Sequence, residues 1–208
     1  PGQADLLQAD VWWRGRPIAH DAGTYSYNAP GVFDGAFNQS AAHNTPMLAG
    51  REPLQKAGRF LYLPWPEGSA QWLDDEKLFR ASHDGYGKDA QVSRAISVPR
   101  DGVFEISDEF KLRRPGQVRV HWLLADLDWR LDATAQTVTA KIGENDYIVS
   151  WKCASRARSA TLVRAASDSA RGWWSRYYLA VEPAVSLELL FDVEQEVKVT
   201  TRFTPGGL

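Results

Sequence analysis

The sequence predicts an all-β protein, a two-sheet antiparallel β-sandwich with few or no helices. Three observations support this fold class. Apolar residues recur with a period of two rather than 3.6, the alternating runs are rich in Val, Ile, Thr and aromatic residues, and Gly, Pro, Asn or Asp bound each run. Short strands at this spacing favour two packed sheets that each bury one face.

A hairpin is expected near the start of the chain. The segments 11–14 and 18–20 are short and apolar, and they flank Gly15-Arg16-Pro17, which has the composition of a turn. Loops are expected between residues 21 and 40. The segment 68–88 is polar and contains several glycines, which indicates an excursion between strands.

The later strands follow from the alternation. In the segment 117–124 the Val and Trp side chains fall on one face, whereas Arg119 and His121 fall on the other. Further strands are expected with the same period, over residues 103–112, 137–142, 146–152, 160–164, 173–181, 185–193 and 197–203. No linker, internal repeat or low-complexity tract separates them, so a single domain over residues 1–208 is expected.

The charge balance bears on possible partners. The chain has 24 basic and 26 acidic residues and a formal net charge of −2, so it lacks the basic excess expected of a nucleic-acid-binding protein. No apolar run approaches the roughly 20 residues that span a bilayer. We therefore predict no nucleic-acid partner and no membrane span. Cys153 is the only cysteine, which excludes an internal disulfide.

The chain lacks the short motifs of stand-alone catalysis. It has no Gly-x-Ser-x-Gly elbow, no His-Glu-x-x-His, no Cys-x-x-Cys and no glycine-rich phosphate loop. The first fifty residues nevertheless concentrate His20, Asp21, His43 and Asn44. Two imidazoles and a carboxylate could bind zinc if the fold brings them together. The alternative is that Asp21 caps a turn and the histidines bond to backbone carbonyls.

Aromatic and arginine residues in the same region suggest sugar binding. Indole rings stack on the apolar faces of sugars, and the guanidinium fork suits sugar carboxylates. The candidate substrate-binding residues are Trp12, Trp13, Arg14, Tyr25, Tyr27, Asn28 and Asn44. The alternative is that most of the nine tryptophans fill the core and the arginines are solvated.

Several segments resemble heparinase II/III-like polysaccharide lyases. Within residues 10–28, Asp21-Ala-Gly-Thr-Tyr25 resembles the family's Asp-x-Gly-Thr-Tyr segment, and Ala42-His-Asn-Thr45 resembles its His-Asn-Thr motif. Residues 171–178 resemble the family's Gly-Trp-x-Ser-x-x-Tyr strand, and residues 201–205 resemble its closing strand. The resemblance spans nearly the whole chain.

The resemblance implies a fold and an activity. It implies a β-sandwich of the super-sandwich type, preceded in the same protein by an α/α-toroid that this chain lacks. Such lyases cleave uronate-containing anionic polysaccharides by β-elimination in the cleft between the two parts. The toroid supplies much of the catalytic machinery, so the isolated chain is expected to be an inactive fragment. A periplasmic or secreted location is favoured.

The resemblance also implies a metal site. The family's His-x-His-Ala-Asp motif falls on residues 1–5, where Pro1 and Gln3 replace both histidines. Carried over, the ligands of a structural zinc or other divalent metal are Gln3, Asp21 and His43, and His43 is also the one candidate catalytic residue. Because Gln is a poor zinc ligand, the alternative is an Asp21–His43 hydrogen-bonded pair that orients the loop at Asn28.

Two further functions stay open from the sequence. A carbohydrate-binding module without chemistry would use Trp12, Trp13 and Arg14 as its stacking platform. A structural domain that stabilises its toroid partner would instead carry an exposed apolar patch larger than roughly a few hundred Å².

Overall fold

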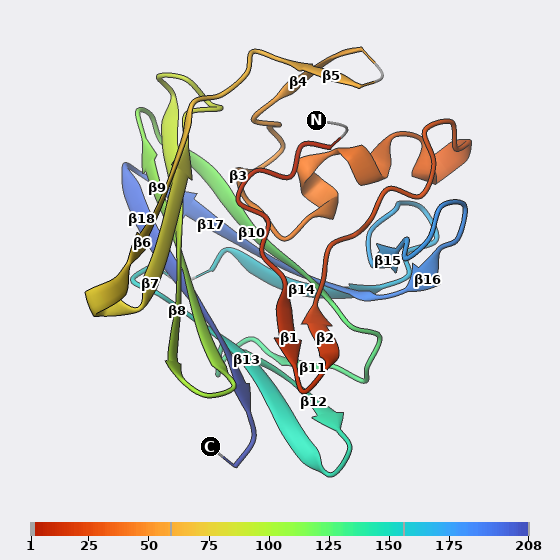
Figure 1. The fold of residues 1–208 in the computed structure, drawn as a ribbon, viewed down its shortest axis with the longest axis vertical. Coiled ribbons are helices and arrows are strands. Elements are labelled where there is room, and N and C mark those ends of the chain that lie inside the picture. The colour runs from red at the N-terminus through yellow and green to blue at the C-terminus, as the bar shows by residue number, and fades with distance from the viewer. Residues whose placement is uncertain (1–2, 59, 156, 208) are drawn as a thin grey trace.

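The computed structural model describes residues 3–58, 60–155 and 157–207, and it confirms the all-β sandwich (Figure 1). The larger sheet has eight antiparallel strands in the order β11-β12-β13-β18-β9-β8-β7-β6. In that order the strands are Arg130–Asp132, Thr137–Ile142, Asn145–Cys153, Glu196–Pro205, Val103–Leu112, Ala90–Arg100, Leu78–His83 and Gly68–Leu73.

The second sheet has six strands, with β1-β2-β10-β17-β14 along its main path and β3 paired to β10. In that order the strands are Val11–Trp13, Arg16–Ala19, Gly116–Leu124, Val185–Val193, Ser159–Arg164 and, last, β3 at Pro46–Leu48. Two small hairpins lie outside both sheets, formed by β4 and β5 (Gln55–Gly58, Leu61–Leu63) and by β15 and β16 (Trp173–Trp174, Glu182–Pro183).

The main core lies between the two sheets. Val118, Val120 and Trp122 of β10 point inward, as the alternation predicts, and all three are fully buried. Trp122 meets Phe203 of β18 edge to face, with ring centroids 4.9 Å apart. Aromatic and branched side chains interdigitate here, so burial of apolar surface supplies most of the driving force for folding.

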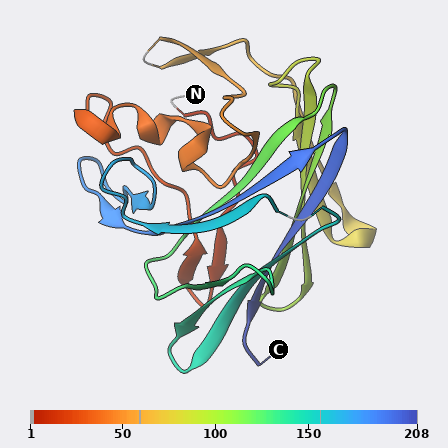
Figure 2. The same cartoon turned by 180° about the vertical axis from the view of Figure 1, so that it is seen from behind.

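The opposite face of β10 is covered as well. Three short 3₁₀ helices, η1 (Gly31–Phe33), η2 (Ala36–Asn38) and η3 (Ser40–Ala42), lie with the β15–β16 hairpin over the outer side of the six-stranded sheet (Figures 1 and 2). A small apolar cluster joins this layer to the sheet, with Phe37 and Leu123 at its centre. The outer face of β10 is therefore a second interior, and it contains the buried polar side chains of Arg119 and His121.

Two expectations about the strands are wrong. The segment 68–88 is not an excursion, because it contains the β6–β7 hairpin closed by η4 (Asp74–Glu76). The segment 173–181 is a strand only at Trp173–Trp174. Beyond Trp174 the chain turns, since Leu179 has a φ of 62° and its amide bonds to the carbonyl of Tyr25. That contact to a distant loop outweighs the alternating pattern.

The expected N-terminal hairpin is confirmed. β1 and β2 pair across a tight turn at Arg14 and Gly15, where φ is 49° and 73°. Positive φ at both positions is the geometry of the type I′ turn, which is common in two-residue hairpins. In the described part of the chain, no helix has the length and apolar character of a membrane span.

Candidate functional site

Asp21 and His43 form a direct pair. The Asp21 Oδ2 atom lies 2.7 Å from Nδ1 of His43, and Asp21 Oδ1 accepts the backbone N–H of Gly23 at 2.7 Å. The His43 side chain is completely buried, whereas one third of the Asp21 side chain is exposed. Nε2 of His43 has no hydrogen-bond partner among the described residues. The pair fixes the start of the loop that carries Tyr25, Tyr27 and Asn28.

The contact between Asp21 and His43 shifts the pKa values of both residues. Burial acts to lower the pKa of His43, but the hydrogen bond and charge of Asp21 outweigh it and raise that pKa above its ordinary value. Burial acts in the opposite direction on Asp21, and the bond to His43 holds the pKa of that carboxyl below its ordinary range. Below neutral pH the pair is therefore an imidazolium bound to a carboxylate.

These three residues do not fit a metal as they are arranged. Oδ2 of Asp21 and Nδ1 of His43 bond to each other, so neither of these two atoms is free for a cation as placed. The Gln3 amide donates to the carbonyl of Gly23 at 2.9 Å and to the hydroxyl of Thr24 at 3.0 Å. Across the ranges that the structure describes, no three His, Cys, Asp or Glu side chains group as metal ligands. Pro1 lies outside those ranges.

The two segments that resemble lyase motifs pack against each other. Gly23 pairs with Ser175 in a parallel bridge, and a Cβ on Gly23 would lie 2.0 Å from the Ser175 carbonyl oxygen. The ring of His20 lies on Trp174, with centroids 4.1 Å apart. Burial lowers the pKa of His20, so this ring is neutral where His43 is charged. The motifs thus share one structural unit, which explains why glycine is needed at position 23.

Asn44 is fully buried and is used by the backbone. Its Nδ2 donates to the carbonyls of Ala9 and His20, and its Oδ1 accepts the N–H of Leu123 at 2.6 Å. All of these contacts lie within the domain. A substrate contact by Asn44 stays a prediction, and as placed the side chain ties the N-terminal segment to β10.

The predicted substrate-binding residues fall into two groups. Trp12, Trp13 and Arg14 lie at the β1–β2 hairpin, whose turn points away from η1–η3 (Figure 1). Trp12 is 53% exposed. The Arg14 guanidinium lies 4.8 Å from the ring centre of Trp13, which in turn packs on Tyr147. The hairpin therefore presents one free indole ring and one supported indole.

The second group belongs to an exposed aromatic patch, which we define as Tyr27, Phe60 and Tyr178. Tyr27 meets Phe60 edge to face at 4.8 Å and lies 5.8 Å from the ring of Tyr178. All three are exposed, as are Leu61 and Leu179 beside them in sequence. Tyr25 is instead half-buried against Phe33 and Phe37, and Asn28 is exposed at the end of the loop.

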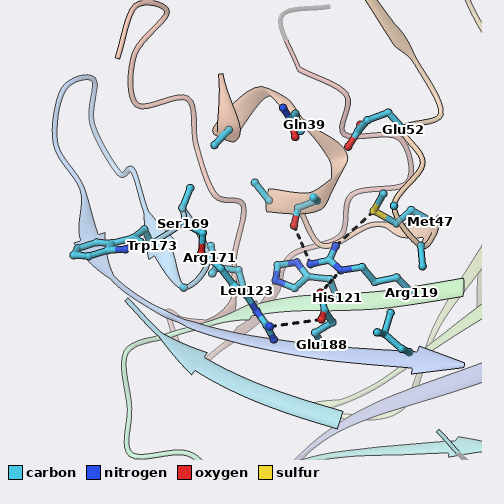
Figure 3. A pocket seen from close by; sticks show the side chains of 18 residues that line it. Gln39, Met47, Glu52, Arg119, His121, Leu123, Ser169, Arg171, Trp173 and Glu188 are labelled. Atoms are coloured by element: carbon cyan, nitrogen blue, oxygen red, sulfur yellow. Dashed lines mark hydrogen bonds and ion pairs between the residues drawn. The ribbon is translucent and has the colours of Figure 1, made fainter. Parts of the chain in front are cut away.

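The sequence reasoning missed a pocket of about 570 Å³ between the outer face of β10 and β17 and the covering layer. We call it the outer pocket. Glu188 of β17 lies between Arg119 and Arg171 at its floor, while Gln39 and Glu52 lie on the opposite side (Figure 3). The alternation placed Arg119 on this face, but only the burial of a charged residue would have signalled a site.

The floor of the outer pocket is joined by hydrogen bonds to the Asp21–His43 region. Nδ1 of His121 bonds to the carbonyl of His43 at 2.9 Å, and Nε2 bonds to the hydroxyl of Ser186 at 2.8 Å. Because a carbonyl only accepts, Nδ1 carries the proton and Nε2 accepts from Ser186. Burial lowers the pKa of His121 well below its ordinary value, so the ring stays neutral.

Comparison with known protein families finds one match. The family model for the heparinase II/III-like C-terminal region matches residues 1–203. Among curated proteins no similar sequence was found. The fold matches the heparan sulfate lyase HepC from Pedobacter heparinus at 16% identity and a TM-score of 0.78, over 98% of this chain and 31% of that one.

Two further solved structures are similar. A heparinase III matches at 15% identity with a TM-score of 0.78, and a lysine-methylated heparinase III matches at 16% identity with a TM-score of 0.75. Each match covers 98% of this chain and 30% of the matched chain. This chain therefore spans less than a third of the length of these relatives. Because the family model covers nearly all of the chain, the protein belongs to the heparinase II/III-like family and comprises its C-terminal β-sandwich.

Proposed function

We propose that this sandwich is one wall of a lyase that cleaves uronate-containing anionic polysaccharides by β-elimination, together with a helical toroid that precedes it in the same protein. The family match over residues 1–203 carries the proposal. The fold similarity to solved lyases more than three times as long supports the need for a second domain. On this proposal the 208-residue chain alone is inactive.

The reaction sets what the two walls must supply. A base removes the proton at C5 of the uronate, its electron pair forms the new double bond, and the leaving glycosidic oxygen takes a proton. The uronate carboxylate must be neutralised while charge develops beside it. We assign the base and acid to the toroid, since His43 is fully buried here and does not reach solvent.

The sandwich would then bind and position. Asp21 and His43 hold the loop of residues 21–28, which presents Tyr27 and Asn28 at the surface. The aromatic patch of Tyr27, Phe60 and Tyr178 lies beside this loop. Exposed aromatic groups of this kind mark contacts with sugars or with another domain. Either contact suits a wall of a cleft between domains.

The first experiment is to measure the size of the native protein with an antibody raised against this chain. The proposal expects a band well above 23.3 kDa, the mass of the chain itself. The native protein should then release unsaturated uronate from an anionic polysaccharide, and Asp21→Ala should lower kcat. A native band at the mass of the chain would contradict the presence of a toroid domain. A longer protein that cuts none of a panel of uronate polymers would contradict the proposed lyase activity.

A second function is favoured by the hairpin. Trp12 is half exposed beside the Arg14–Trp13 stack, an arrangement that suits sugar binding without catalysis. The test is glycan-array binding by the 208-residue chain. Binding that is lost in Trp12→Ala supports a carbohydrate-binding module. Equal binding by the variant and the wild type would exclude the hairpin as the platform.

A further inference from the structure

The outer pocket has the size and the walls of a small-molecule site. Its volume of about 570 Å³ lies within the range of roughly 300–1,000 Å³ of such sites. The walls are unusually small and apolar. Alanines 36, 41, 42, 49 and 170 line it together with Trp173, whose indole N–H is already bonded to the carbonyl of Ala166. Larger side chains at these positions would fill the space.

The floor carries more positive than negative charge. Two guanidinium groups, Arg119 and Arg171, share the single carboxylate of Glu188. The Arg119 side chain is 8% exposed and that of Arg171 is 25% exposed. Solvent therefore stabilises the positive charge of Arg119 only weakly. Glu52 is the other acidic residue of the pocket, but it lies on the opposite side and accepts the backbone N–H of Ser40 at 2.9 Å. His121 is neutral and adds no charge.

Both guanidinium groups line the outer pocket and retain unused donor capacity. Arg119 binds Glu188 through Nε at 2.5 Å and the Ala41 carbonyl through Nη2, but its Nη1 has only the Met47 sulfur at 3.6 Å, a weak acceptor. Arg171 donates hydrogen bonds through Nε to the hydroxyl of Ser186 and through Nη2 to the hydroxyl of Thr161. Its Nη1 lies 3.5 Å from Glu188 and makes no hydrogen bond within the described ranges. An anionic oxygen at either guanidinium would give that Nη1 group the strong acceptor that it lacks within the protein.

We propose that the outer pocket binds a small carboxylate on a ring-sized, weakly polar body. The carboxylate lies at the Nη1 atoms of Arg119 and Arg171. The ring lies against the alanines and Trp173, and its polar groups face Gln39 and Glu52 at the opposite side. Where the proposed function holds, the ligand is an acidic monosaccharide, and only that identification rests on the proposed function.

The test uses sodium glucuronate, glucose and sodium sulfate as probes of the 208-residue chain, followed by backbone amide shifts in NMR. Glucuronate should bind saturably and shift the amides of Ala42, Ala170 and Gly172, while glucose binds at least tenfold more weakly. Sulfate should also bind more weakly, since it gains nothing from the apolar walls. Equal affinity for glucuronate and glucose, equal affinity for sulfate, or shifts confined to residues outside the pocket would overturn the proposal.

Variants locate the binding without relying on one mutation. Ala170→Leu fills the pocket and should abolish glucuronate binding, while Ala135→Leu, on an exposed turn, should leave it unchanged. Arg171→Gln should weaken binding at least tenfold, and Arg158→Gln is its control, because Arg158 pairs with Asp192 outside the pocket. Unchanged affinity in both Ala170→Leu and Arg171→Gln would exclude this site. A failed lyase assay on the longer protein would leave these results unaffected.

Discussion

Two buried arginine–carboxylate systems lie on opposite sides of β10, and they differ in charge balance and in access. On the core side, Arg94 binds Asp108 through two hydrogen bonds of 2.7 and 3.0 Å, and both side chains are almost fully buried. Its Nη1 donates to the carbonyls of Leu7 and Asn44. On the outer side, Arg119 and Arg171 share Glu188 beside a cavity.

The difference separates an ion pair that holds a fold together from one that is prepared for a ligand. The Arg94–Asp108 pair has matched charges, and Nε, Nη1 and Nη2 of Arg94 all donate to oxygen atoms. The Arg119–Glu188–Arg171 group has one carboxylate too few, two weakly used Nη1 groups and open volume. Charge stoichiometry and unused donors therefore distinguish the two roles better than burial does, because a buried charge alone is compatible with either.

The largest effect is expected when the buried Arg94–Asp108 pair is broken. Arg94→Met leaves the Asp108 carboxylate buried without a partner, so the free energy of unfolding should fall by about 3–5 kcal/mol in urea denaturation at pH 7. The control is Arg94→Met with Asp108→Leu, which removes both charges and should recover much of the loss. If the single variant is as stable as the double variant, the pair does not hold the core.

The second effect concerns the Arg119–Glu188–Arg171 group at the floor of the outer pocket. Glu188→Gln leaves Arg119 and Arg171 facing each other without a carboxylate, which should lower the free energy of unfolding by about 1–3 kcal/mol. Sodium sulfate should restore more stability to this variant than sodium chloride does at equal ionic strength. Wild type, compared in the same two salts, is the control. Equal recovery in both salts would argue against an anion site.

Protonation gives a third, smaller test. Burial lowers the pKa of His83 to about 4. Between pH 6.5 and 4 the unfolded chain binds a proton that the folded chain does not, so this histidine should reduce the stability at pH 5 by roughly 2 kcal/mol relative to pH 7. His83→Asn should remove that part of the acid sensitivity. A variant with the wild-type pH profile would contradict the assignment.

The Asp21–His43 pair should respond with the opposite sign. The pKa of His43 is raised, so its contribution is complete below about pH 6.5 and is lost as pH rises through the raised value. Asp21→Asn should therefore lose more stability at pH 6 than at pH 8. Zinc should not protect the wild type from thermal unfolding if the pair, rather than a metal, holds this loop.

The smallest expected effect is at the exposed hairpin. Trp12→Ala should change the free energy of unfolding by less than about 0.5 kcal/mol, since about half of the residue is exposed to solvent. Trp13→Ala is the matched comparison and should cost more, because Trp13 packs on Tyr147. Equal losses in the two variants would show that Trp12 is part of the core rather than a free surface ring.

The alternation in the sequence was sufficient to predict the sandwich and the inward face of β10, because a period of two follows directly from strand geometry. It could not show that residues 31–42 fold over the other face, since that contact joins segments far apart in the chain. The alternation therefore places Arg119 and His121 on the face away from the core, and both are nevertheless buried. The β6–β7 hairpin was missed because its strands are largely polar or exposed.

The candidate site was predictable only in part. The Asp21–His43 pair followed from a motif resemblance combined with the loss of a histidine at position 3, and the structure contains that pair. The outer pocket had no local motif, because its floor combines residues from β10, β17 and the segment before β15. A pocket of this kind is visible only once the register of the strands is known.

The strand order has a consequence for how the molecule forms. β17 lies between β10 and β14, and β18 lies between β13 and β9, so the last long strands of the sequence sit inside the two sheets. During synthesis the earlier strands cannot complete the two sheets before β17 and β18 have been made. Until these two strands emerge from the ribosome, the nascent chain exposes unpaired strand edges. Folding should therefore be slow, on the milliseconds-to-seconds scale of proteins dominated by distant pairings, and a stop codon before residue 185 should yield aggregation rather than a smaller sandwich.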